Sequence, residues 1–186
     1  TVAPGGSGIG TLSVGGAYTQ TSAGNLSIGL TPSSTDLLAI TGLSSLAGNI
    51  TIAGLTASGN PNAFSHAILF GDQGSISGGA SILSGSGNIV ISGNTLGGGN
   101  YSNGVYFQSS LAHPVTIAAS GVGSVSLTGF TSNPSTLENH GVFFEEGTQA
   151  ISTQNGALSI TGKGSGTNGY GIAFQHAAST NNTTIG

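Results

Sequence analysis

The chain has 186 residues, and more than half of them are glycine, serine, threonine or asparagine. Only 3% of the residues are charged, against roughly 25% in an ordinary soluble domain, and Lys163 is the only lysine or arginine. This composition excludes a basic surface for nucleic acid and an arginine site for phosphate or carboxylate groups.

The hydrophobic fraction of 36% is sufficient for a buried core, unlike the composition of a disordered linker. The sequence contains no run of about 18 apolar residues, the length that a membrane helix needs. No signal peptide begins at Thr1. Because the chain lacks an initiator methionine, we expect a processed product or a piece of a longer protein. A surface of serine, threonine, asparagine and glycine predicts an extracellular or cell-surface location.

The first 47 residues contain three short apolar segments bounded by small residues, at 10–15, 24–29 and 38–42. They predict the three strands of a first, less regular coil. In this register Leu12 precedes Ile50 by 38 residues, which matches the period of the later repeats.

From residue 48 onward the sequence repeats itself. Segments of the pattern Gly-x-apolar-x-apolar-x-Gly begin near residues 48, 87, 123 and 156. Their first apolar residues form a column with spacings of 39, 36 and 33 residues: Ile50, Ile89, Val125 and Leu158. Large aliphatic residues alternate with small ones, and this period of two is typical of a strand with one buried face.

Each repeat contains two further columns. The second column ends in phenylalanine and comprises Phe70, Phe107, Phe144 and Phe174. The third column comprises Ile82, Ile117, Ile151 and Ile185. Each repeat therefore contains three short strand-like segments, bounded by glycine, asparagine and proline.

These columns predict an all-β fold, a right-handed parallel β-helix that forms one solenoid over residues 1–186. We expect four to five coils of three short strands, with 33–39 residues per coil. Equivalent strands pair about 4.8 Å apart, so equal residues stack as ladders, among them the two columns headed by Ile50 and Phe70. An antiparallel sandwich would not require the same residue type to recur at a coil period.

Turn-forming residues separate the strands. A glycine closes each first strand, and we expect these glycines to turn a corner with positive φ: Gly54, Gly93, Gly129 and Gly162. Asn60-Pro61 and Asn133-Pro134 predict turns in equivalent loops.

The only acidic cluster comprises Glu138, Glu145 and Glu146, beside His140. Two carboxylates at a suitable separation can hydrolyse a glycoside. Adjacent residues of a strand point to opposite faces, however, so Glu145 and Glu146 do not form such a pair within a strand. We expect both to lie in solvent at a strand end.

Four equivalent positions before the second strands carry polar or aromatic side chains: His66, Asn103, His140 and Tyr170. This column predicts a polar ladder rather than a metal site, because a whole coil separates the two histidines by roughly 10 Å. His113 and His176 are expected in solvated loops. The sequence predicts no catalytic residue, no metal ligand and no cofactor.

Two further candidate binding motifs are incomplete. Gly162-Lys163 lacks the serine or threonine that follows the lysine of a phosphate-binding loop. Calcium-binding nonapeptide repeats need a recurring aspartate, and the chain has only Asp36 and Asp72.

The recurrent Gly-Asn-(Ile/Leu)-(Ser/Thr/Val)-Ile-x-Gly strand, in a cysteine-free frame rich in glycine, serine, threonine and asparagine, resembles the repeats of bacterial surface β-helix proteins. These include filamentous-haemagglutinin-like exoproteins and the passenger domains of autotransporter adhesins. The resemblance covers roughly residues 10–186 and implies an extracellular scaffold or adhesive role without catalysis in the shaft. The repeats are longer than the coils of about 20 residues in haemagglutinin shafts.

Three classes of function remain open. The first is a structural or adhesive module of a surface protein or filament, whose partners are copies of itself or further repeats end to end, and host or cell-surface glycans or proteins. The second is a tailspike-like protein that binds or processes polysaccharide. The third is an ice-binding solenoid, suggested by outward hydroxyl ranks such as Ser126-x-Thr128 and Ser159-x-Thr161. Nucleic acid and membrane insertion are not expected.

Overall fold

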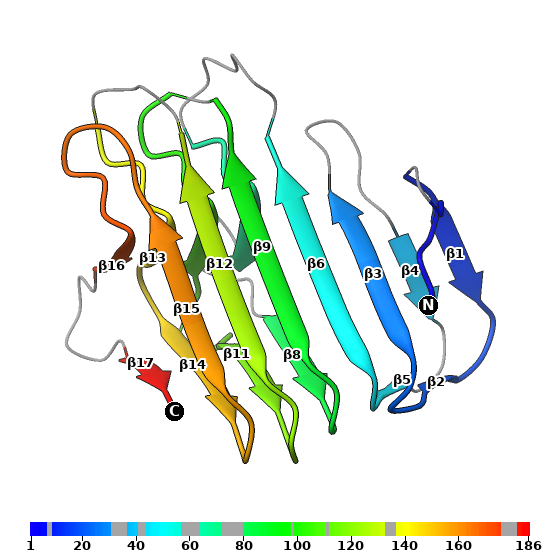
Figure 1. Cartoon of the computed structure of the whole chain (residues 1–186). Helices are drawn as coiled ribbons and strands as arrows, with labels where there is room; N and C mark the ends of the chain where they lie inside the picture. The colour runs from blue at the N-terminus through cyan, green and yellow to red at the C-terminus, as the bar shows by residue number, and fades with distance from the viewer. Residues whose placement is uncertain are drawn as a thin grey trace.

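The computed structural model describes residues 1–6, 9–30, 37–40, 44–56, 64–71, 80–97, 99–110, 112–132, 137–175 and 182–186. Over these residues the chain forms 17 β-strands and no helix, and neighbouring strands of the sheets are parallel (Figure 1). The predicted all-β parallel solenoid is confirmed. The predicted turns at Asn60-Pro61 and Asn133-Pro134 lie outside the described residues.

Three parallel sheets form the sides of the solenoid, and every regular coil contributes one strand to each. The first sheet faces the viewer in Figure 1 and contains β3 (Asn25–Leu30), β6 (Asn49–Leu55), β9 (Ile89–Thr95), β12 (Val125–Thr131) and β15 (Leu158–Lys163). The second sheet contains β7 (Ile68–Gly71), β10 (Val105–Gln108), β13 (Val142–Phe144) and β16 (Ile172–Phe174). The third contains β8 (Ala80–Ser84), β11 (Val115–Ala119), β14 (Thr148–Thr153) and β17 (Asn182–Ile185).

The regular part is slightly shorter than the four to five coils that we predicted. About three turns separate β6 from β15, since β6, β9, β12 and β15 are successive neighbours in the first sheet. Of the preceding strands, only β3 joins one of the three large sheets.

The N-terminal strands follow a shorter period. β1 (Thr11–Val14) pairs with β4 (Leu37–Ile40), and β2 (Tyr18–Gln20) pairs with β5 (Ser44–Leu46). The expected alignment of Leu12 with Ile50 is therefore wrong: Leu12 pairs with Leu38, whereas Leu26 pairs with Ile50 and bridges to Val2. Paired residues here are only 24–26 positions apart, because these coils lack the long insertions found later.

The apolar interior is built from ladders of equivalent residues. Ile50 pairs with Ile89, Ile89 with Val125, and Val125 with Leu158. The first three side chains are buried in one continuous core, and Leu158 packs against it from the last coil. The isoleucines of the third sheet, Ile82, Ile117, Ile151 and Ile185, also lie in register.

The phenylalanines of the second sheet form a stack along the solenoid axis. Successive ring centroids are 5.0, 4.7 and 4.9 Å apart from Phe70 through Phe107 and Phe144 to Phe174, and no pair of rings is tilted by more than 20°. Phe107 and Phe144 are fully buried, whereas Phe174 is 52% exposed in the last coil. Such offset stacking adds about 0.5–1.5 kcal/mol per pair beyond the burial of apolar area.

The asparagine that opens the first strands bonds along the axis. The Nδ2 atom of Asn49 donates to the Oδ1 atom of Asn25 at 2.9 Å, and Asn49 Oδ1 accepts the backbone N–H of Asn88 at 2.8 Å. The Oδ1 atom of Asn88 accepts the backbone N–H of Ser124 at 2.9 Å. The recurring Gly-Asn pair is therefore a structural signature, since each amide links one coil to the next.

The glycines that close the first strands are needed for a different reason from the one we predicted. None of Gly54, Gly93, Gly129 and Gly162 has a positive φ. A Cβ atom at each of them would instead collide with the backbone carbonyl of the residue just before the second strand, namely Ala67, Gly104, Gly141 and Gly171. The solenoid corner brings two backbone segments so close that only glycine fits.

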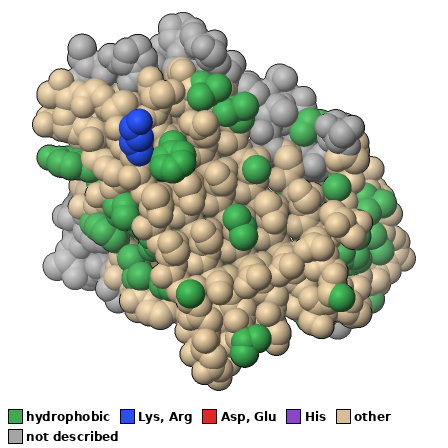
Figure 2. All heavy atoms as spheres, viewed as in Figure 1, with side chains coloured by type: hydrophobic (Ala, Val, Ile, Leu, Met, Phe, Trp, Pro, Cys, Tyr) green, Lys and Arg blue, Asp and Glu red, His purple; other side chains and the backbone are tan. Residues whose placement is uncertain are grey.

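The outward face of the first sheet is almost free of charge. Figure 2 shows this face with scattered hydrophobic side chains and a single basic one, which is Lys163, the only lysine or arginine of the chain. No acidic or histidine side chain is visible on it. Hydroxyl pairs such as Ser126 with Ser159 and Thr128 with Thr161 lie in register across neighbouring strands.

Candidate functional site

Polar and aromatic side chains gather where the chain enters the second sheet, just before β7, β10, β13 and β16. We call this region the second-sheet corner. It consists of three successive positions in each of four coils: 64–66, 101–103, 138–140 and 168–170. Equivalent positions are linked by backbone hydrogen bonds from coil to coil, such as Phe64 N–H to Asn100 O and Ala67 N–H to Asn103 O.

The third position of the corner forms the predicted polar ladder. His66 Nδ1 accepts the backbone N–H of Asn103 at 3.1 Å, and Asn103 Oδ1 accepts the backbone N–H of His140 at 2.8 Å. His140 Nδ1 in turn accepts the backbone N–H of Tyr170 at 3.1 Å. Each of these three side chains therefore accepts from the backbone of the following coil.

The second position carries a ladder of hydrogen bonds in which each side chain accepts from the backbone of the preceding coil. The Ser102 hydroxyl oxygen accepts the backbone N–H of Ser65 at 3.0 Å, and Asn139 Oδ1 accepts the backbone N–H of Ser102 at 2.8 Å. Ser102 and Asn139 are both fully buried. The two ladders satisfy backbone groups that a loop entering a sheet would otherwise leave unpaired.

Burial shifts the acid–base behaviour of both histidines. It lowers the pKa of His66 from its ordinary value of 6.5 to about 4. Burial also lowers the pKa of His140, although the nearby carboxylate of Glu138 acts in the opposite direction. Both rings are therefore neutral at pH 7, which is the state in which Nδ1 can accept a hydrogen bond.

A second aromatic column lies on the outward face of the second sheet. Tyr106 and Phe143 stack with ring centroids 5.5 Å apart and an angle of 16° between their planes. His66 packs on Tyr106 at 4.3 Å, and His140 packs on Phe143 at 4.6 Å. Although both rings point away from the core, Tyr106 and Phe143 are only 5% and 8% exposed.

The expectation that Glu145 lies in solvent is wrong. Its carboxylate accepts a hydrogen bond from the Tyr106 hydroxyl, and its side chain is half-buried. Burial, followed by repulsion from Glu146, raises the pKa of Glu145. The outward direction of Tyr106 accounts for the difference, since Glu145 directly follows the neighbouring strand β13 and reaches the Tyr106 hydroxyl.

The first position of the corner shows the least usual backbone. Phe64 and Tyr101 have φ values of 59° and 61°, in the left-handed region that side chains other than glycine and asparagine rarely adopt. Their rings stack with centroids 5.3 Å apart and planes 13° apart. Phe64 is 52% exposed and Tyr101 is 37% exposed. The equivalent residue of the next coil is Glu138.

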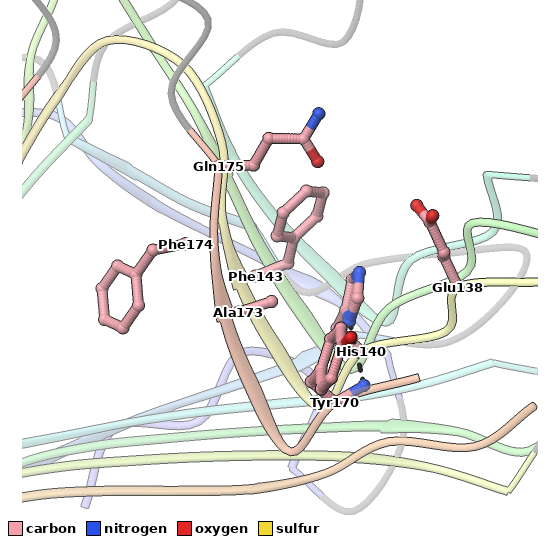
Figure 3. A pocket seen from close by; sticks show the side chains of 7 residues that line it. All are labelled: Glu138, His140, Phe143, Tyr170, Ala173, Phe174 and Gln175. Atoms are coloured by element: carbon pink, nitrogen blue, oxygen red, sulfur yellow. Dashed lines mark hydrogen bonds between the residues drawn. The ribbon is translucent and has the colours of Figure 1, made fainter. Parts of the chain in front are cut away.

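A cavity of about 240 Å³ opens beside the corner at its C-terminal end, lined by Glu138, His140, Phe143, Tyr170, Ala173, Phe174 and Gln175. Figure 3 shows Glu138, His140, Phe143 and Gln175 on one side of the ribbon, whereas Phe174 points to the other side. The rings of His140 and Tyr170 are stacked at 5.6 Å, and Tyr170 is 59% exposed. The cavity thus combines aromatic rings with a carboxylate and an amide.

Within the described part of the chain, no group of three or more histidine, aspartate and glutamate side chains could hold a metal ion. His66 and His140 are kept apart by the coil that carries Asn103. His113 is exposed, with its Nδ1 atom 3.3 Å from the Ser110 hydroxyl. His176, Asp36 and Asp72 lie outside the described residues.

Sequence reasoning missed the two outward pairs, Phe64 with Tyr101 and Tyr106 with Phe143. The two members of each pair are 37 residues apart in the sequence, which is also the spacing of Phe70 and Phe107 in the core. This spacing was a signal that could have found them. The positive φ of Phe64 and Tyr101 is not predicted by either residue type, and the signal for it is Asn168 at the equivalent position of the last coil, which has a φ of 60°.

Comparison with protein-family models, curated proteins and solved structures found no match to the chain. Among the described residues, no helix has the length and apolar character to span a bilayer.

Proposed function

We propose that the chain is an extracellular structural and adhesive repeat module of a surface protein or filament, and that it performs no catalysis. The observation that carries this proposal is the use of the buried polar side chains. Asn103, His140 and Asn139 each bond to the backbone of a neighbouring coil. These contacts tie each coil to its neighbour, which is what a stiff shaft requires.

The surface supports the same function. The outward face of the first sheet displays small hydroxyl and amide side chains with almost no charge (Figure 2). A surface of this kind suits a fibre that stands in solvent, because it offers no strongly charged patch for nonspecific binding. The partners that we propose are copies of the chain or further repeats stacked end to end, together with glycans or proteins of a cell surface.

The proposal is tested on the native protein in its cells. An antibody against the chain should label intact cells, and protease added outside should remove the label. Material released from the surface should form thin unbranched fibres in electron micrographs, with an axial repeat near 4.8 Å in fibre diffraction. Label that appears only after the cells are permeabilised would contradict the proposal.

An ice-binding surface is a second candidate, favoured by the in-register hydroxyl ranks of the first sheet. Ser126 and Thr128 pair with Ser159 and Thr161, but the ranks are interrupted where Thr51 pairs with Val90. Thermal hysteresis and ice recrystallisation measurements on the purified chain decide this candidate. Activity that disappears when Thr128 is replaced by a bulky residue would support it.

A further inference from the structure

Phe64 and Tyr101 are exposed aromatic rings held in a backbone conformation that their residue types avoid. Both lie in the left-handed region, where the Cβ atom approaches the following carbonyl oxygen. Glycine or asparagine at these positions would relieve that repulsion. Backbone strain of this kind concentrates at binding sites, where the surrounding structure holds it in place.

Hydrogen bonds to the next coil hold the backbone at Phe64. The backbone N–H of Phe64 bonds to the carbonyl oxygen of Asn100 at 3.1 Å. One position later, the backbone N–H of Ser65 bonds to the hydroxyl of the buried Ser102 at 3.0 Å. The two rings are therefore presented in a fixed, stacked arrangement rather than as free surface side chains.

The stack has an open end. Phe64 covers one face of the Tyr101 ring, because the stacked planes are only 13° from parallel. Tyr101 is 37% exposed, and in the next coil Glu138 occupies the equivalent position. Glu138 also lines the cavity that contains His140, Tyr170 and Gln175 (Figure 3). The exposed Tyr101 ring and the cavity with its carboxylate and amide thus belong to successive coils of the same corner.

The chemistry of this arrangement restricts the ligand. None of the corner positions carries a lysine or arginine to pair with phosphate, sulfate or uronate groups, and Lys163, the only cationic side chain of the chain, lies on the outward face of the first sheet. An aromatic face binds an apolar or C–H-rich face of a ligand, and a few polar groups beside it fix the orientation. A sugar ring has such a face, with hydroxyl groups around its edge that can donate to a carboxylate or an amide oxygen.

We propose that the second-sheet corner binds a neutral saccharide chain laid along the solenoid axis, with one sugar ring stacked on the free face of Tyr101 and hydroxyl groups bonded to Glu138. In the coil of Glu138, the sugar ring takes the place that the rings of Phe64 and Tyr101 occupy in the two preceding coils. This inference deepens the adhesive part of the proposed function, because it names the class of ligand and the residues that contact it.

The experiment screens the purified full chain on a printed array of neutral oligosaccharides of glucose, galactose, mannose and N-acetylglucosamine. The best binder is then titrated in solution. The chain has four tyrosines and no tryptophan, so its intrinsic fluorescence comes from tyrosine, and the part of the binding signal that Tyr101→Asn removes reports binding at Tyr101. We expect a saturable fluorescence change with a neutral oligosaccharide and none with polygalacturonate, whose carboxylates meet no cation at the corner.

The decisive variant is the double substitution Phe64→Asn and Tyr101→Asn. Asparagine accepts the left-handed backbone, so this variant should unfold at the same temperature as the parent chain or a higher one. Its affinity for the oligosaccharide should fall by about tenfold, the size expected for lost ring stacking. Glu138→Gln should weaken binding without changing the melting temperature. Val122→Asn, at an apolar residue that is 71% exposed outside the corner, is the matched control and should bind like the parent.

Three results would overturn the inference: no neutral oligosaccharide is retained on the array, the asparagine double variant binds as tightly as the parent, or polygalacturonate binds more tightly than every neutral oligosaccharide. These results are separable from the proposed function. Surface fibres without saccharide binding would remove only this inference. Saccharide binding by a chain that is found inside the cell would remove only the extracellular function.

Discussion

His140 Nδ1 accepts the backbone N–H of Tyr170 at 3.1 Å, so one imidazole joins the coil of β13 to the coil of β16. The same bond joins His66 to Asn103 in the first two regular coils. A ring nitrogen accepts a hydrogen bond only while it carries no proton. Protonation of either ring would therefore leave two N–H donors facing each other between two coils, with no acceptor.

The first prediction is that acid destabilises the fold through these histidines. Because the folded-state pKa of His66 is about 4 and the ordinary value is 6.5, the unfolded chain takes up the proton first. The contribution of neutral His66 to the free energy of unfolding is therefore fully present above pH 6.5. It is lost as the pH falls toward 4, which lowers the free energy of unfolding by about 3 kcal/mol. Urea unfolding at a series of pH values measures this loss.

The second coil provides the matched control for this prediction. Asn103 accepts the equivalent ladder bond with an amide oxygen that does not titrate in this range. His66→Asn should therefore preserve the ladder at pH 7 and remove most of the acid sensitivity between pH 6.5 and 4. An unchanged pH dependence in that variant would contradict our assignment of the titrating group.

The second prediction concerns the phenylalanine stack. Phe107 is fully buried between Phe70 and Phe144, so Phe107→Ala leaves a cavity and should cost about 3–5 kcal/mol of unfolding free energy. Phe174→Ala removes the same ring from the exposed end of the stack and should cost roughly 1 kcal/mol, the value of one stacking contact. Denaturant unfolding of both variants tests the difference, and equal losses would argue against a continuous core.

The third prediction concerns Tyr106 and Glu145. The phenol hydrogen bond favours the ionised carboxylate, so Tyr106→Phe should raise the pKa of Glu145 further and cost about 1 kcal/mol of stability. A raised folded-state pKa means that the stabilisation from this group is present below its ordinary pKa and is lost as the pH rises through the folded value, opposite in sign to the histidines.

An NMR titration of the Glu145 carboxyl carbon measures the effect of Tyr106→Phe. Tyr170→Phe removes a hydroxyl from an exposed ring and serves as the control. A pKa of Glu145 that stays the same or falls in Tyr106→Phe would show that the phenol does not stabilise the carboxylate.

The fourth prediction concerns the corner glycines. A Cβ atom at Gly129 would collide with the carbonyl of Gly141, so Gly129→Ala should cost about 3 kcal/mol as the backbone is pushed apart. Gly16 has no atom within 4 Å of such a Cβ and no positive φ. Gly16→Ala should stabilise the fold by about 0.4–1 kcal/mol, because it only restricts the unfolded chain. Thermal or urea unfolding distinguishes the two variants.

The parts of the fold that could be predicted are those where one residue type has one structural use. Ile50, Ile89 and Val125 could be aligned because an inward position of a repeated strand requires a large aliphatic side chain at each coil. A constant period places Leu12 beside Ile50, which is wrong because the first coils are shorter than the later ones. The letters Gly24-Asn25-Leu26 match Gly48-Asn49-Ile50 and identify the true partner, and the coil between them is short because nothing is inserted in it.

The candidate site could be predicted only in part. The polar ladder of His66, Asn103 and His140 followed from their equivalent positions. The hydrogen bond between Tyr106 and Glu145 did not, because it joins two residues of neighbouring coils whose positions in the repeat differ. The left-handed backbone of Phe64 and Tyr101 was not predicted either, since neither residue type favours it and only Asn168, at the equivalent position of the last coil, indicates it.

The direction of the hydrogen bonds has a mechanical consequence. In all three sheets the strands pair with equivalents in the coil before and after, so the hydrogen bonds lie along the axis of the solenoid. A pulling force along that axis acts first on the hydrogen bonds of the coil at one end. The coils then unfold one after another. Val125 follows its partner Ile89 by 36 residues, so each rupture of such a coil releases about 120 Å of extended chain. A tether built in this way yields in steps and dissipates work at each one, rather than snapping at a single load.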